Sequence, residues 1–282
     1  MTTGYKINHA SDNAAGYSIA KNWEAKLSSL DIAADNAATG ADMLATLEDN
    51  YALISTHVQR VRDLTEQASN GTYGADSKKA IESEITARLE EINRIAANCE
   101  FNGIQMMDGT NNTAKAIQVG VDGNPANSQI ALSADLFASG QIDALFAVTG
   151  YTPVSTGIAT GDASKPDKVM AKKLENLAKD CAGTSEYSGH KTSTDMLGVL
   201  DKVINKISER ITTLGAAQNR IESAIESIGV QSENITSSLS TLRDADVATE
   251  SSNYIKAQIL QQASATLLAT ANQTPSIALN LL

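Results

Sequence analysis

Residues 197–242 read LGVLDKVINKISERITTLGAAQNRIESAIESIGVQSENITSSLSTL, and this stretch decides the fold. Its apolar residues recur at alternating intervals of three and four, which is typical of a helix that packs lengthwise against other helices. Such a helix would be about 69 Å long at 1.5 Å per residue. The repeating positions, called the seam below, are Leu197, Leu200, Ile204, Ile207, Ile211, Leu214, Ile221, Ile225, Ile228, Ile235, Leu239 and Leu242, with Gln218 and Ser232 as polar interruptions.

The composition suits thin helical bundles. Of the 282 residues 42% are hydrophobic, but only three Phe, seven Tyr and one Trp occur, so the core must be aliphatic. The net charge of −11 argues against a nucleic-acid partner, because phosphate binding needs clustered cations. No apolar run approaches the roughly 20 residues that span a bilayer, and no signal peptide of the secretory type stands at the start. Cys99 and Cys181 are too few for a disulfide framework; two isolated thiols or one bridge both stay open.

Proline and glycine divide the chain into segments. All four prolines lie outside 1–124 and 167–274, so two long segments are free of helix breakers. We expect a mainly α protein, an elongated antiparallel helical bundle or coiled coil with a small β-hairpin and a short variable insert. The predicted parts are a connector (1–13), a helical core with the hairpin (14–135), a variable outer insert (136–189), the returning long helix (190–243) and a C-terminal segment (244–282).

Local signals place the elements within these parts. Asp12 or Asn13 can cap a first helix that ends near Asn70-Gly71, and a second helix is expected over about 76–98. Alternating residues at 116–121 and 129–132 predict the β-hairpin. Within the Gly-, Ser- and Thr-rich insert, a short helix is expected over 167–183.

The last helix is predicted over about 247–272, and we expect Pro275 to end it. Its apolar surface needs a cover, because large exposed apolar patches mark interaction sites. The residues that would carry such contacts are Ile255, Ile259, Leu260, Ala263, Leu267, Leu268, Leu279 and Leu282.

A search for chemistry finds no catalytic, metal-binding or nucleotide-binding motif, so we expect no cofactor and no enzyme activity. Gln59–Gln67 (QRVRDLTEQ) is on composition alone an ordinary polar helix face with ion pairs.

Several ordered blocks nevertheless resemble the bacterial flagellin family. TGYKIN (3–8) and SDNAAG (11–16) resemble the family's SG-x-RIN and DDAAG blocks, QRVRDL (59–64) resembles QRVREL, and FNG (101–103) is shared. Near the other end, RDAD (243–246), KAQILQQ (256–262) and ANQ (271–273) match the family's blocks. The resemblance covers about 1–135 and 190–282.

The resemblance implies a structural subunit of the extracellular flagellar filament, exported without a cleavable signal peptide. Its termini would lie together, its long C-terminal helix would return along residues 14–98, and other flagellin subunits would be its partners. It also implies an export chaperone on the C-terminal segment. Flagellins begin with about 30 further residues, roughly 45 Å if helical, so the chain is expected to be truncated at its N-terminus.

The resemblance further implies recognition of the monomer by the animal Toll-like receptor for flagellin. By position the receptor-binding residues would be Gln59, Arg60, Leu64 and Glu84, although Asp63 stands where the family has Glu. Two alternatives stay open: a hook-associated filament-junction protein of the same fold, and an enzyme or ligand-binding module in the insert.

Overall fold

A computed structural model describes residues 3–109, 113–147, 175–184 and 193–280, with side chains up to residue 271. The long helices are α1 (Ala14–Ser69), α2 (Ala75–Asn98), α6 (Ser193–Arg243) and α7 (Val247–Asn280). The short elements are β1 (Glu100–Phe101), β2 (Ile104–Gln105), β3 (Lys115–Gln118), α3 (Pro125–Ser128), β4 (Gln129–Leu132), η1 (Ala134–Phe137) and α4 (Ile142–Ala147). Residues 175–182 are also helical.

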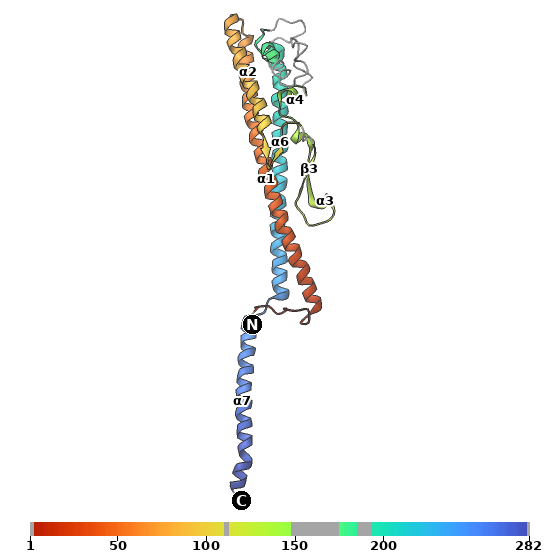
Figure 1. Ribbon diagram of the computed structural model, residues 1–282, viewed down its shortest axis with the longest axis vertical. Coiled ribbons are helices and arrows are strands. Elements are labelled where there is room, and N and C mark those ends of the chain that lie inside the picture. Colours follow the sequence, from red (N-terminus) through yellow and green to blue (C-terminus); the bar gives the residue numbers. More distant parts are fainter. Residues whose placement is uncertain (1–2, 110–112, 148–174, 185–192, 281–282) are drawn as a thin grey trace. The chain divides into compact units, whose positions relative to one another are not determined.

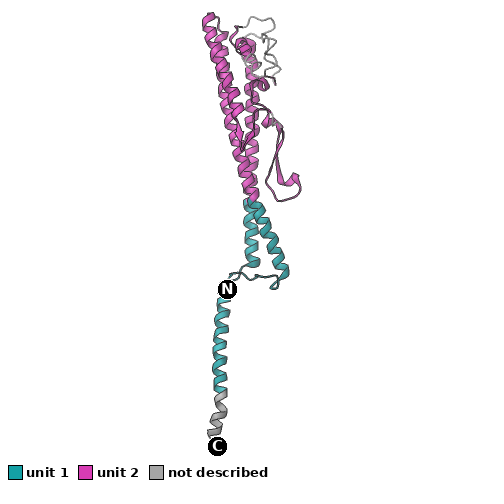
Figure 2. Cartoon of the chain, viewed as in Figure 1, with its two compact units in different colours: residues 1–31, 229–282 teal, residues 32–228 magenta. Residues whose placement is uncertain are grey.

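The chain forms two compact units (Figure 2), residues 1–31 with 229–282 and residues 32–228. The predicted insert (136–189) lies mostly outside the described residues, as does the start of the helix expected over 167–183. The five predicted parts of the chain remain predictions.

The larger unit is an antiparallel helical bundle, so the predicted fold class is confirmed (Figure 1). Side-chain contacts fix the direction of α6 against α1. Arg62 Nε donates to Asp201 Oδ1 (2.6 Å), and further along both helices Gln218 Nε2 donates to Glu48 Oε2 (2.8 Å). Residue numbers therefore rise on one helix as they fall on the other. The contact to Glu48 also satisfies Gln218, one of the two polar interruptions of the seam.

The seam of α6 is covered unevenly. Leu200, Ile207, Leu214, Ile221 and Ile228 stand seven residues apart and are at most 4% exposed. The seam positions between these five residues are only half-buried. At three of these positions the preceding residue is buried instead and completes the buried face. The half-buried positions are Ile204, Ile211, Gln218 and Ile225, and the buried residues before the first three are Val203, Arg210 and Ala217. Leu197, Ile235, Leu239 and Leu242 are also half-buried.

The buried face turns toward a second neighbour because the segment after η1 also packs on α6. Arg210 Nη1 donates to the Tyr51 hydroxyl on α1 (3.2 Å) and to the Ser139 carbonyl oxygen (3.3 Å). The Tyr51 hydroxyl donates in turn to the Ala138 carbonyl oxygen (3.2 Å). Burial raises the pKa of Tyr51, and the guanidinium of Arg210 opposes that rise. This network ties α1, α6 and the connecting segment together in the core.

Both ends of α1 follow from local sequence. Asn13 Oδ1 accepts from the backbone N–H of Gly16 (2.9 Å), which is the bond of an N-cap, and the helix ends one residue before Asn70. The extent of α7 corrects the prediction made from Pro275, since the helix continues past it to Asn280. A proline removes only one backbone donor, and near a helix end that loss leaves most of the helix intact.

The predicted β-hairpin is confirmed. Strands β3 and β4 pair antiparallel with Lys115 opposite Leu132 and Gln118 opposite Gln129. The hairpin approaches α1 closely at Gly40, where an added Cβ would lie 2.5 Å from Ile117 Cδ1. A second, smaller hairpin, β1 with β2, turns at Asn102 and Gly103, whose φ angles of 49° and 78° suit an Asn-Gly turn.

Candidate functional site

Among the described residues, the most exposed apolar surface belongs to α7, in the smaller unit. Ile255, Ile259, Leu260, Leu267 and Leu268 are between 54% and 70% exposed, and Ala263 is exposed as well. At 100° per residue these six side chains span about 220° of the helix circumference, and the exposed Val247 and Tyr254 lie in the remaining sector, so apolar side chains project on every side. Helices that are apolar all round are buried in their working state. The Leu279 side chain and all of Leu282 lie outside what the structure describes.

Charge is scarce on α7. Glu250 and Lys256 are its only charged residues, and Asp246 stands just before its first turn. The Asp246 carboxylate accepts from the backbone N–H of Ala248 (3.0 Å) and from the Thr249 hydroxyl (2.8 Å). The hydrogen bonds from Thr249 and Ala248 lower the pKa of Asp246. The helix is therefore capped at its start by the last residue of RDAD and left uncovered as far as residue 271, where the description of its side chains ends.

The blocks near the two ends of the chain meet in the smaller unit. The backbone N–H of Lys6 donates to the Arg243 carbonyl oxygen (2.6 Å), and that of Ala245 donates to the Gly4 carbonyl oxygen (3.0 Å). The Arg243 guanidinium lies 3.9 Å from the centre of the Tyr5 ring and also pairs with Glu24. TGYKIN and RDAD thus form one structure between α6 and α7, a pairing that their separate sequences do not reveal.

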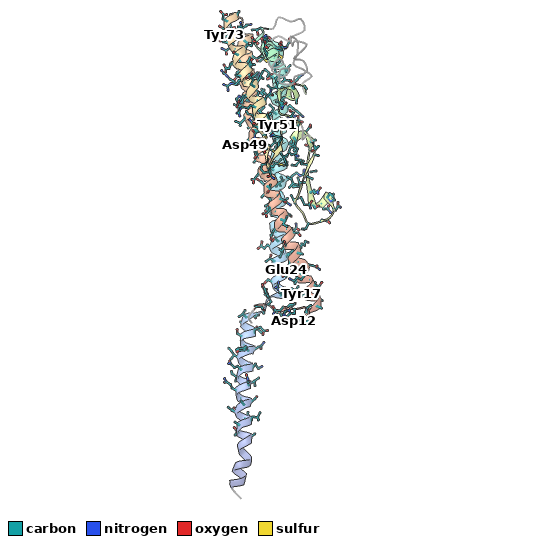
Figure 3. The ribbon with its side chains drawn as sticks, in the orientation of Figure 1. Asp12, Tyr17, Glu24, Asp49, Tyr51 and Tyr73 are labelled. Atoms are coloured by element: carbon teal, nitrogen blue, oxygen red, sulfur yellow. The ribbon has the colours of Figure 1, made fainter. Side chains whose placement is uncertain are left out.

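The N-terminal connector is ordered by its own hydrogen bonds. The Asp12 carboxylate (Figure 3) accepts from the backbone N–H of His9 (2.9 Å) and of Asn8 (3.0 Å). These two bonds lower the pKa of Asp12. The block SDNAAG therefore shapes the turn into α1, with Asp12 holding the turn and Asn13 capping the helix.

The second candidate surface lies on α1 and α2 in the larger unit. Arg60 and Glu84 form an ion pair across the two helices, with Arg60 Nη2 2.9 Å from Glu84 Oε1 and both side chains exposed. Gln59 is exposed and donates to Ser55 Oγ (3.4 Å). Leu64, in contrast, is 2% exposed and packs in the core, so it supports this surface from below.

The structure brings together no reactive groups in the part of the chain that it describes. Among the residues that the structure describes, no group of three or more His, Cys, Asp and Glu side chains could hold a metal ion. Both cysteines are free and buried, and burial raises the pKa of Cys99 to about 11 and that of Cys181 to about 12. Their thiols are therefore protonated at neutral pH. No described helix is long and apolar enough to cross a membrane.

Sequence comparison identifies relatives along the whole chain. Residues 1–112 match the bacterial flagellin N-terminal helical region, and residues 197–282 match the bacterial flagellin C-terminal helical region. A flagellin of Bacillus subtilis is 34% identical over 286 aligned residues, which cover 100% of this chain and 90% of the relative. Polar flagellin A of Vibrio parahaemolyticus is 29% identical, with 100% of this chain and 92% of the relative covered.

A solved structure shares the fold at much lower identity. The structure of a putative flagellar hook-associated protein from Vibrio parahaemolyticus superposes with a TM-score of 0.61 and 12% identity. The superposition covers 83% of this chain and 100% of that one. At this identity the likeness concerns the fold alone.

Proposed function

Because the chain belongs to the bacterial flagellin family, we propose that α7 is the surface through which it assembles into a flagellar filament. A flagellin is a structural subunit of the filament, which lies outside the cell. The observation that carries the proposal is the exposure of apolar side chains on every side of α7. One partner covers one face of a helix, whereas neighbours in a filament can enclose it.

Polymerisation of the full chain tests this proposal. Each aliphatic side chain buried between subunits contributes about 1.5–3 kcal/mol, and a carboxylate in the same place costs free energy. Leu260→Asp should therefore prevent sedimentation of filaments at concentrations where the parent chain sediments. Leu260→Met, which keeps the apolar volume, is the matched control. Normal filaments from the Leu260→Asp variant would refute the role of α7.

The same surface supports a second partner, an export chaperone that covers α7 before assembly. A helix with this much apolar surface would otherwise associate non-specifically. Deleting 247–282 should abolish capture of the chain by the purified chaperone, and undiminished capture by the shortened chain would contradict this proposal.

Recognition by the animal Toll-like receptor for flagellin is proposed for the surface made by Gln59, Arg60 and Glu84. The ion pair between Arg60 and Glu84 supports it, because a pair bridging two packed helices presents charges in a fixed arrangement. Arg60→Ala should weaken receptor binding by the monomer, whereas Arg94→Ala, which breaks an exposed pair within α2 alone, should not. Equal binding by the two variants would exclude this site.

A hook-associated role is the alternative that the shared fold leaves open. A filament subunit should polymerise alone over long lengths, whereas a junction protein should add only to existing ends. Electron microscopy of the purified chain, with and without filament seeds, separates the two roles.

A further inference from the structure

The larger unit carries a groove that the proposed role of α7 does not use. It has a volume of about 390 Å³ and lies between α1 and the two small hairpins. The lining residues that matter here are Met43 on α1, Phe101 and Ile104 on β1 and β2, and Lys115 and Ile117 on β3. The missing side chain of Gly40 lets Ile117 form its floor. A recess of this size takes two or three aliphatic side chains.

The groove is mostly apolar but has one cation. Lys115 is the only charged residue among its lining residues, and its ammonium lies 5.2 Å from the centre of the buried Phe137 ring. Among the described residues Lys115 forms no ion pair. The groove therefore fits a projecting apolar side chain with a carboxylate close beside it.

The chain itself has an exposed apolar side chain beside a carboxylate elsewhere on α1. Leu53 is 53% exposed, so its apolar side chain projects from α1 into solvent. Asp49 stands one turn before it, is exposed, and likewise forms no ion pair in the described part of the chain (Figure 3). Residues four apart lie on the same face of a helix, so Leu53 and Asp49 project together.

Ile32, the other exposed aliphatic residue of α1 in this unit, does not project away from the groove. It stands four residues before Asn36, which lines the groove, and so continues the groove's own wall. Leu53 lies ten residues after Met43, which places it about 80° around the helix from the groove. Leu53 and Asp49 together are called the knob below. The knob and the groove are thus on different faces of the same molecule.

We propose that Leu53 and Asp49 of one copy dock into the groove of a second copy, with Asp49 beside Lys115. This inference rests on the proposed filament and names a contact within it. Because the two halves of the contact lie on different surfaces, the pairing is heterologous and each docked copy leaves a free knob and a free groove. Such a contact propagates into a chain of subunits instead of closing into a dimer.

The pairing of Asp49 with Lys115 also offsets a general electrostatic repulsion between copies. Each copy carries a net charge of −11, so contacts between copies are disfavoured unless opposite charges meet. A lysine facing an aspartate gives local attraction and fixes which groove residue lies next to Leu53. Charge here contributes specificity more than affinity.

Cross-linking between two differently tagged variants tests the contact directly. Leu53→Cys in one copy and Ile104→Cys in the other should form a disulfide when mixed filaments are oxidised with copper phenanthroline, which takes up the two electrons. Cys99 and Cys181 are buried and should not react. Cross-linked products should contain one copy of each tag, and filaments of either variant alone should give none.

The outcomes separate this contact from the filament proposal. Mixed filaments that sediment without heterologous cross-links would overturn the contact and leave the filament intact. Cross-links between two Leu53→Cys copies would show that α1 pairs with itself, which also overturns it. A parent chain that never sediments would overturn both proposals.

Charge exchange gives a second readout that needs no cysteine. Asp49→Lys or Lys115→Glu alone should raise the critical concentration for polymerisation about five-fold, equivalent to about 1 kcal/mol. The double variant with both substitutions should return to within about two-fold of the parent, because the opposite charges meet again. A double variant as poor as the two single effects combined would contradict the contact.

Discussion

α6 and α7 follow one another in the chain, and both are rich in leucine and isoleucine, yet only one has its apolar residues covered. In α6 the buried residues form one face, and five of them repeat every seven residues. In α7 the large apolar side chains between Val247 and Leu268 project on every side and remain exposed. A helix with one apolar face can be satisfied inside its own molecule, whereas a helix apolar on all sides has to be satisfied by other molecules.

Truncation of matched side chains in the two helices should produce the largest difference in stability. Ile207→Ala in α6 should lower the free energy of unfolding by about 2–5 kcal/mol, because it leaves a cavity in a closed core. Ile259→Ala in α7 removes the same atoms from an exposed site and should leave monomer stability almost unchanged. Urea denaturation followed by circular dichroism measures both, and equal losses would refute the distinction.

A graded control lies within α6 itself. Ile211 is a seam residue but only half-buried, so Ile211→Ala should cost less than Ile207→Ala. If the two variants lose the same stability, the seam and not the observed burial describes the core.

The polar network around Arg210 shows that a closed core also depends on hydrogen bonds to its buried polar groups. Tyr51→Phe removes the hydroxyl that accepts from Arg210 and leaves a buried donor short of one partner. We expect a loss of about 1–3 kcal/mol. Thr56→Val, at an exposed position one turn further along α1, is the control that should cost little, and a Tyr51→Phe variant as stable as the parent would show that the network adds nothing.

The smallest expected effect is a pH dependence at the start of α7. Because the Asp246 pKa is lowered in the folded chain, its cap stabilises the helix above the ordinary value of 3.8. That contribution is lost as the pH falls through the lowered pKa. The protection factors of the Ala248 and Thr249 amides, which are exchange rates corrected for the intrinsic effect of pH, should therefore fall at acid pH in the parent. In an Asp246→Ala variant these protection factors should be low throughout, and identical pH profiles for the two chains would contradict the cap.

Sequence predicted the helices, the β-hairpin and most helix ends, because periodicity, caps and turn residues are local signals, but it placed the end of α7 too early. It did not predict which residues of α6 are fully buried. The seam treats Ile211 and Leu214 as equivalent, but the segment that carries Ser139 packs beside Arg210 and shifts the buried face by one position. That shift depends on residues about 70 positions away in the chain.

The candidate surfaces could also be predicted only in part, because contacts between distant segments are not visible in the local sequence. The apolar character of α7 is visible in the sequence, and so is the block around Arg60, but the ion pair of Arg60 with Glu84 joins two helices and needs their packing. Leu64 belongs to the same block and has the opposite environment. The groove beside Gly40 could not be predicted either, because its walls come from three separate segments.

Hydrogen–deuterium exchange of α7, compared between monomer and sedimented filament, measures whether this helix is uncovered in the monomer and enclosed by neighbouring subunits in the filament. Its amides from Ile255 to Leu268 should exchange rapidly in the monomer and become strongly protected in the filament, while those around Ile207 should be protected in both. Rapid exchange along α7 in intact filaments would contradict the enclosure of this helix by neighbouring subunits.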